Sequence, residues 1–382
     1  MGMAGKPFAF TEEQRELRRT VRAFLEHAAP EPEVRRLMET SDGYDPAVWA
    51  QLAGELGLVG LAIPEELGGS GATFVEVAIV AEEMGRRLLC APYLSTAVLA
   101  VGTLLRSGDA GAQKAWLPGI AAGETIATLA FAEENGRWDA SGVAAVAAQA
   151  GDGWTLAGTK SFVLDGHTAD LLLVAARSAA GVSLFAVPGD APGLTRAPLS
   201  TLDQTRRLAR VELAGAPATL LGEDGAGWPV IEHVLNLATV ALAAEQAGGA
   251  EAVLDMAVQY AKDRVQFGRQ IGSFQAVKHR CADMLLEVES ARSAAYYAAW
   301  CAAGATAADG GDDELARIAA VAKAYCSEAY TQVAADNIQV HGGIGFTWEH
   351  SAHLYFRRAK SDELLFGAPA TWRDRLATSI GV

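Results

Sequence analysis

The chain of 382 residues is long enough for two or three domains, and its 51% content of hydrophobic residues can fill sizeable cores. Its formal net charge of -15 repels phosphates over long range, which argues against a general affinity for nucleic acid or for anionic membrane surfaces. An anionic ligand would therefore need a local site of positive charge.

The N-terminal segment and the cysteines indicate where the protein resides. The first ten residues, MGMAGKPFAF, lack an apolar core of signal-peptide length, and no uninterrupted apolar run approaches the length of a membrane span. The cysteines lie far apart in apolar segments, without the spacing of a metal site or of a disulfide framework: Cys90, Cys281, Cys301 and Cys326. We expect a cytoplasmic protein with buried thiols and no bound metal.

Residues 1–127 are predicted to form a helical domain. A T-x-x-Q capping box at Thr11 and Gln14 begins one amphipathic segment, and Asp45 followed by Pro46 begins another. The loop IPEELGGSGAT then precedes a third segment in which apolar residues recur at helical spacing.

The pattern changes near residue 128. Short apolar runs such as DLLLVAAR and VSLFAVP alternate with Gly, Pro and Asp turns, which predicts a small antiparallel, barrel-like β domain at 128–221. From 222 to 382 long alanine-rich helical patterns return, and their rows of small residues suit a four-helix bundle. The predicted fold class is α+β and multidomain, with a β domain between two helical regions.

The segment RVQFGRQIGSFQAVKH, residues 264–279, interrupts the helical pattern. Arg264 and Arg269 bring fixed positive charge, and Gly268 allows a close approach of the backbone where one helix passes to the next. A pyrophosphate fits that chemistry. An ordinary turn between helices with solvated arginines is the alternative.

A second segment, QVHGGIGFTWEH, covers residues 339–350. Its Gly-Gly-x-Gly run follows a long helix and is either a simple C-cap or a place where exposed amides meet a flat or phosphorylated group. No acid or nucleophile accompanies His341 in the sequence, so we expect a structural role for that imidazole.

Together these two segments, within the order helical, β, helical, resemble the acyl-CoA dehydrogenase family of flavoproteins. The resemblance covers nearly the whole chain and includes three further stretches: PEELGGSG in the first domain, Gly158–Phe162 in the β domain and Leu220–Trp228. It implies a tetramer that binds FAD where the β domain meets the C-terminal bundle.

The resemblance also implies a reaction. In this family a glutamate removes the α proton of an acyl-CoA thioester while the β hydrogen leaves as hydride to the flavin, giving the 2-enoyl-CoA, and an electron-transfer flavoprotein accepts the electrons. Several residues match family positions that reach the FAD of the neighbouring subunit: Arg264, Gln266, Phe267, Gln275, Gln339, Gly342 and Gly343. Phe131 and Phe162 match positions that face the flavin.

The expected catalytic glutamate is missing at both family positions. Phe366 stands at the position near the C-terminus, and Ala238 stands at the alternative position on the first long helix of the last domain. Glu245 lies on the same face of that helix, about 10 Å further along, and is the remaining candidate base. Asp362 and Glu363 lie near Phe366, but we expect them on a solvated, ion-paired face.

Two polar positions of the β motifs are also changed. Ala132 stands where the family has a threonine hydroxyl, and Leu164 stands at another hydroxyl position. Two hydrogen bonds to the flavin ring are therefore missing, each worth roughly 1 kcal/mol.

Basic residues near the C-terminus allow two interpretations. Arg357, Arg358 and Lys360 could meet a phosphate of coenzyme A, or they could form a solvated charged face. The density of charge in this segment favours the solvated face.

The uneven pattern leads to a hypothesis with alternatives. Residues that would hold a partner's FAD are present, whereas those for the chain's own flavin and proton transfer are changed, as expected for the companion subunit of an α2β2 heterotetramer. A self-sufficient homotetramer with Glu245 as base is the first alternative. A related flavin monooxygenase or oxidase and a purely structural partner subunit are the others.

Overall fold

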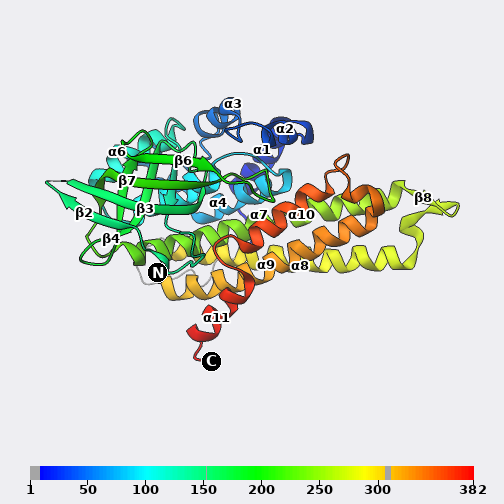
Figure 1. Ribbon diagram of the computed structural model, residues 1–382. Helices are drawn as coiled ribbons and strands as arrows, with labels where there is room; N and C mark the ends of the chain where they lie inside the picture. The colour runs from blue at the N-terminus through cyan, green and yellow to red at the C-terminus, as the bar shows by residue number, and fades with distance from the viewer. Residues whose placement is uncertain (1–8, 152, 306–310) are drawn as a thin grey trace. The chain divides into compact units, whose positions relative to one another are not determined.

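The computed structural model describes residues 9–151, 153–305 and 311–382 (Figure 1). The first third is helical, as predicted: α1 (Glu12–Ala28), α2 (Glu31–Met38), α3 (Pro46–Ala50), α4 (Phe74–Arg87), α5 (Val101–Arg106) and α6 (Ala110–Ala121). The capping box begins α1, because the Gln14 amide donates to Thr11 Oγ1 at 3.2 Å and the Thr11 amide donates to Gln14 Oε1 at 2.9 Å. The Asp45 side chain accepts the Ala47 amide at the start of α3.

The central region forms one sheet of seven strands within the described residues. The strands are β1 (Ala127–Ala130), β2 (Val146–Ala150), β3 (Gly153–Leu164), β4 (Leu171–Arg177), β5 (Val182–Pro188), β6 (Leu194–Pro198) and β7 (Leu208–Leu221). Most ladders are antiparallel, and the pairings from β4 through β2, β3, β7 and β5 return to β4. Two pairings in this mainly antiparallel sheet are parallel: β1 pairs with β4, and Val146 of β2 pairs with Arg177 of β4.

The last region is helical: α7 (Gly227–Asp263), α8 (Gln275–Ala305), α9 (Asp312–His341), α10 (Ala352–Leu364) and α11 (Pro369–Ser379), with the short hairpin β8 (Val265–Gln266) and β9 (Arg269–Gln270) between α7 and α8. The predicted succession of helical, β and helical regions is confirmed. Among the described helices, α7 is long and apolar enough to cross a membrane, but 78% of its most apolar window is buried within the protein. That burial is typical of a core helix.

The chain divides into two compact units that cut across these three sequential regions. The helical unit contains α1, α4 and the chain from Thr239 onward, whereas the β unit contains Leu37–Thr73 and Cys90–Ala238. Helices from the two ends of the sequence therefore share one core.

Two glycines allow α4 and α7 to pack closely in the helical unit. A Cβ atom at Gly85 would lie 2.0 Å from the carbonyl oxygen of Glu245, and one at Gly248 would lie 1.9 Å from that of Glu82. No other residue fits such a separation. The backbone around Glu245 is thereby fixed against α4.

A buried pair of acids binds α1 to the same core. Arg18 Nη2 lies 2.6 Å from Glu82 Oε2, and Arg22 Nη2 lies 2.7 Å from Glu83 Oε1. Burial raises the pKa of Glu82 to about 6, although Arg18 and the hydroxyl of Tyr296, which donates to the carboxylate at 2.9 Å, act in the opposite direction. The pairs belong to a wider network, because Arg292 Nε lies 3.6 Å from Glu82 Oε1 and Arg18 Nε lies 3.8 Å from Glu83 Oε1.

Candidate functional site

The segment that begins at Arg264 forms an exposed turn at the end of α7. The Arg264 amide donates to the Tyr260 carbonyl at 2.9 Å, and β8 then pairs with β9. Phe267 and Gly268 join these strands with φ values of 53° and 77°, as in a type I′ hairpin loop. The Phe267 side chain is 91% exposed. Its ring meets that of Phe274 edge-on, with the two centroids 6.1 Å apart, and most of its surface is exposed at the tip of the hairpin.

The polar side chains that the sequence predicts for cofactor binding in this segment are exposed as well. They are Arg264, Gln266 and Gln275. Gln266 Nε2 donates to the Val265 carbonyl at 2.9 Å, and Gln275 begins α8 with its amide 3.4 Å from the His279 ring. These groups can reorient toward an external ligand at little cost, because they face solvent.

The glycine-rich segment forms a second exposed turn where α9 ends. Gln339 is exposed on the last helical turn, and Gly342 follows with φ of 64°. A Cβ atom at Gly342 or at Gly343 would meet nothing within 4 Å, whereas one at Gly345 would lie 3.0 Å from the Ile338 carbonyl. The first two glycines therefore leave open backbone, and Gly345 is required for packing.

His341 connects the two turns. Its ring centroid lies 4.2 Å from that of Tyr260, whose carbonyl accepts the Arg264 amide, and its Nδ1 lies 2.9 Å from the Asn337 carbonyl. Burial lowers the pKa of His341. These contacts are those of a structural imidazole, and they bring both motifs to the same end of the helical unit, where Figure 1 shows β8 beyond the long helices.

Seven predicted residues thus gather on what we call the exposed end: Arg264, Gln266, Phe267, Gln275, Gln339, Gly342 and Gly343. A guanidinium and three carboxamides supply donors, and the open glycines allow the backbone to approach a ligand. Such a set of exposed donors and open backbone can meet an anionic, polar ligand.

The positions of the β unit that match the family's flavin-facing positions carry apolar side chains, unlike the polar residues of the exposed end. Phe131 is buried directly after β1, and Phe162 lies in β3 where the pairing with β7 is irregular. The φ of Phe162 is 58°, a left-handed value that costs a bulky residue roughly 1–2 kcal/mol. Ala132 and Leu164 are both buried and bring no side-chain donor.

A buried ion pair supports this part of the β unit, and sequence reasoning missed it. Lys160 Nζ lies 2.6 Å from Glu133 Oε1 and donates to the Phe131 carbonyl at 3.3 Å, while the amides of Ala144 and Ala145 also donate to Glu133. Burial lowers the pKa of Lys160 to about 8, and Glu133 opposes that shift. Burial alone would raise the pKa of Glu133, but Lys160 and the two amides lower it.

The two family positions for the catalytic base hold no titratable group. Phe366 is 2% exposed and adopts φ of 62°, and its carbonyl accepts the Trp372 indole at 3.1 Å. Ala238 is fully buried on α7. The backbone bend at residue 366 is thus present with a side chain that cannot accept a proton.

Glu245, the remaining candidate base, is held by a buried arginine. Its carboxylate is ion-paired with Arg358 Nη1, and both side chains are nearly inaccessible. The guanidinium stabilises the ionised carboxylate and occupies one of its oxygens. This arrangement is typical of a structural ion pair.

The structure corrects the expected solvated face on α10. Arg358 and Asp362 are buried, because with Leu354 they recur every four residues and lie on the inner stripe of the helix. Glu363 does pair with Lys360, at 2.7 Å. This four-residue spacing, visible in the sequence, could have predicted that Arg358 is buried and able to pair with Glu245.

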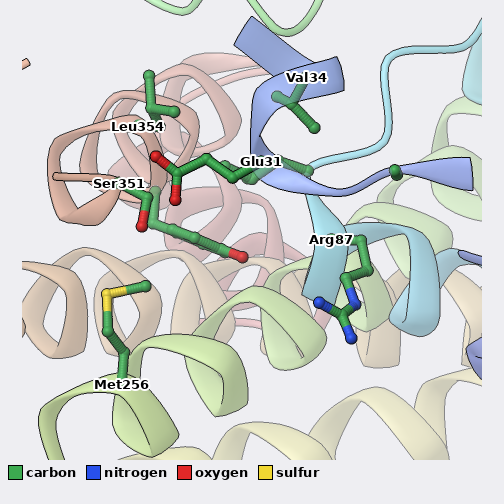
Figure 2. A pocket seen from close by; sticks show the side chains of 9 residues that line it. Glu31, Val34, Arg87, Met256, Ser351 and Leu354 are labelled. Carbon is green, nitrogen blue, oxygen red and sulfur yellow. The ribbon is translucent and has the colours of Figure 1, made fainter. Parts of the chain in front are cut away.

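A pocket of about 210 Å³ lies elsewhere in the helical unit (Figure 2). Figure 2 shows Glu31 and Val34 of α2, Arg87 of α4 and Met256 of α7 around it. None of the predicted site residues is among its lining. The Arg87 guanidinium at this pocket is paired with Glu26 at 3.0 Å.

Family models match almost the entire chain in three consecutive pieces. They are the acyl-CoA dehydrogenase N-terminal domain at residues 11–124, the middle domain at 128–213 and the C-terminal domain at 225–381. The chain belongs to the acyl-CoA dehydrogenase family, whose members are FAD-dependent oxidoreductases that act on CH–CH bonds.

Within that family, particular relatives resemble the chain over its full length. Acyl-CoA dehydrogenase IpdE2 of Mycolicibacterium smegmatis is 37% identical over 97% of this chain and 99% of the relative. The ChsE4-ChsE5 complex from Mycobacterium tuberculosis matches with a TM-score of 0.88 and 31% identity, covering 98% and 99% of the two chains. A variant of the Tcur3481-Tcur3483 steroid ACAD matches with a TM-score of 0.85 and 32% identity, covering 97% and 98%.

Proposed function

We propose that this chain is the companion subunit of a two-chain acyl-CoA dehydrogenase. The observation that carries the proposal is Phe366, an apolar side chain at the family's base position, in a chain whose exposed end is complete. The similarity to ChsE4-ChsE5 and Tcur3481-Tcur3483, each described by two chain names, supports an assembly with a related subunit. The related subunit supplies the carboxylate.

The exposed end is this chain's contribution to the reaction. FAD, when bound in the partner, would supply the acceptor for the hydride that leaves the β carbon of the substrate. Arg264 neutralises charge on the pyrophosphate, and Gln266, Gln275 and Gln339 supply amide donors along the dinucleotide. The exposed ring of Phe267 covers the cofactor from this side.

The substrate we infer is an acyl-CoA thioester with a bulky acyl group, which becomes the 2-enoyl-CoA. The neighbour described as a steroid ACAD supports a large ring system as the acyl group. An electron-transfer flavoprotein in the cytoplasm is the proposed acceptor, in line with the family.

A self-sufficient enzyme with Glu245 as base agrees less well with the geometry. A base must reach the proton that it removes, and Glu245 is buried and already paired with Arg358. The exposed end, moreover, has no role in a protein without cofactor chemistry, which disfavours a purely structural subunit.

The test is to express the chain alone and together with a family member that retains the glutamate. We expect no turnover of acyl-CoA by either chain alone and turnover by the copurified pair, followed by reduction of an electron-transfer flavoprotein or an artificial acceptor. A homotetramer of this chain with full dehydrogenase activity would contradict the proposal.

A further inference from the structure

Three aromatic rings gather on the β unit where the family resemblance expects a flavin. Phe131 follows β1, Trp138 lies in the next loop, and Phe162 lies in β3. The Trp138 ring centroid lies 5.6 Å from that of Phe131 and 6.5 Å from that of Phe162, with interplanar angles of 55° and 36°. Both separations are in the range of favourable aromatic pairs. Trp138 thus bridges the two residues that would face the cofactor.

The loop that holds Trp138 is braced by its own hydrogen bonds. Asn135 Nδ2 donates to the Gly142 carbonyl at 2.8 Å, and the Arg137 amide donates to Asn135 Oδ1 at 2.9 Å. Arg137 Nη1 donates to Ser141 Oγ at 3.0 Å. These hydrogen bonds therefore hold the loop before and after Trp138.

The chemistry around these rings does not fit an isoalloxazine. A flavin ring has a polar edge of carbonyls and nitrogens that needs hydrogen-bond partners when buried. Ala132 and Leu164 bring no such groups, and the Ala132 carbonyl already accepts the Ser161 amide at 2.9 Å. The Lys160 ammonium is engaged by Glu133 and by the Phe131 carbonyl. Contacts between aromatic side chains thus stand where a flavin ring would need polar partners.

We propose that Trp138 occupies the flavin position of this chain's own β unit, so that the chain binds no flavin there and serves only the cofactor of its partner. The inference rests on the proposed companion role and identifies the residue that sets flavin stoichiometry. Phe131 and Phe162, predicted from sequence to face the flavin, face the indole instead.

The experiment removes the Trp138 ring, restores the two hydroxyl groups that the family has, and measures the amount of bound FAD. The full-length chain is purified alone and with its partner, as wild type, as Trp138→Ser, and as Trp138→Ser with Ala132→Thr and Leu164→Thr. Trp154→Ser is the matched control, because Trp154 begins β3 and its ring meets Phe185 at 5.3 Å. Each protein is titrated with FAD, and bound flavin is quantified per chain.

We expect the wild type and the control to bind no FAD when purified alone. Trp138→Ser should bind FAD weakly, and the added threonines should tighten binding about thirtyfold, as two hydrogen bonds of about 1 kcal/mol each would. In the complex, the rebuilt variant should hold twice the flavin of the wild type.

Several results would overturn the inference. A wild-type chain that holds one FAD on its own, or rebuilt variants that keep the wild-type circular dichroism spectrum yet gain no flavin, would do so. If the substitutions disturb folding, the FAD content of the wild type and of Trp138→Phe tests the inference instead. One FAD on each isolated wild-type chain would overturn it. Failure of the proposed function is distinguishable, since it would appear as a partner whose FAD content and turnover are the same without this chain.

Discussion

The exposed end of the helical unit and the three aromatic rings of the β unit both match family positions for the cofactor, but their side chains differ in character. At the exposed end, Arg264 and Gln339 face solvent, and Gly342 has open space where a side chain would be. On the β unit, the Trp138 ring contacts those of Phe131 and Phe162. Under our proposal, hydrogen-bond donors remain at the end that would bind the partner's FAD. On the β unit, aromatic side chains lie where the chain's own flavin would be.

The difference shows how a fold can lose one half of a site and keep the other. An unfilled flavin position would leave apolar surface and backbone polar groups in water or in a cavity, and aromatic contacts remove part of that cost. The exposed end needs no such replacement, because its side chains are solvated in the free chain. The following predictions test the contrast, from the largest expected effect to the smallest.

The largest effect is expected from replacing Glu245, the buried acid that was the remaining candidate for the catalytic base. Glu245→Gln should lower the free energy of unfolding by about 3 kcal/mol or more, because it removes a buried carboxylate that is ion-paired with the Arg358 guanidinium. Urea denaturation measures the loss. Glu328→Gln is the control, since its pair with Arg373 is about half exposed and should contribute under about 1 kcal/mol. An unchanged stability together with lost flavin reduction would restore Glu245 as a catalytic base.

The next effect concerns the exposed end. Arg264→Ala should weaken binding of FAD by the two-chain complex roughly tenfold to a hundredfold, the range for a charge-assisted hydrogen bond, with little change in folding. Fluorescence titration of the flavin-free complex gives the dissociation constant. Lys262→Ala, an exposed cation two residues earlier, should leave it unchanged. Equal effects of both substitutions would indicate only a general field of positive charge.

A smaller effect is expected at the glycine turn. Gly342→Ala must adopt φ of 64° and should lose about 1 kcal/mol of stability, with an additional weakening of FAD binding where its methyl group meets the cofactor. Gly381→Ala provides the control, because Gly381 has φ of 80° and similarly open surroundings near the C-terminus. Flavin binding that changes no more than in the control would argue against close approach of the backbone at Gly342.

The effect that is smallest near neutral pH is a pH dependence next to the same turn. Burial, with Arg357 and Arg35 acting in the same direction and Glu31 opposing, lowers the pKa of His353 to about 4 from an ordinary value near 6.5. The folded state therefore binds fewer protons than the unfolded state between these values, so this stabilisation is complete above pH 6.5 and is lost as the pH falls toward 4.

Melting temperatures measured across that interval test the assignment. His353→Gln should show a flatter dependence than the wild type, whereas His27→Gln, at an exposed histidine on α1, should follow the wild type. The His353 ring lies 4.5 Å from that of Trp348, so its protonation should also loosen the end of the glycine turn. Parallel curves for all three proteins would show that another group controls the acid response.

Local chemistry explains why much of the fold was predictable from sequence. The capping box at Thr11 and the long periodic patterns that became α7 and α9 depend on residues a few positions apart. The glycines of the exposed end could likewise be found from their motif.

The unpredicted features depend on contacts between distant residues. Lys160 meets Glu133 across 27 positions, and Arg358 meets Glu245 across 113. Trp138 lies in an irregular loop, where no periodicity indicates the direction of a side chain. The solvated face expected on α10 was wrong because charge density was considered without the four-residue spacing of its buried stripe.

The most direct test of the central claim is the flavin content of this chain purified alone and with its partner, from visible absorption and extracted FAD. The account predicts almost no flavin in the chain alone and one FAD for each pair of chains in the complex, bound more weakly when Arg264 is replaced. One tightly bound FAD on every copy of the isolated chain, with bleaching by acyl-CoA, would contradict it.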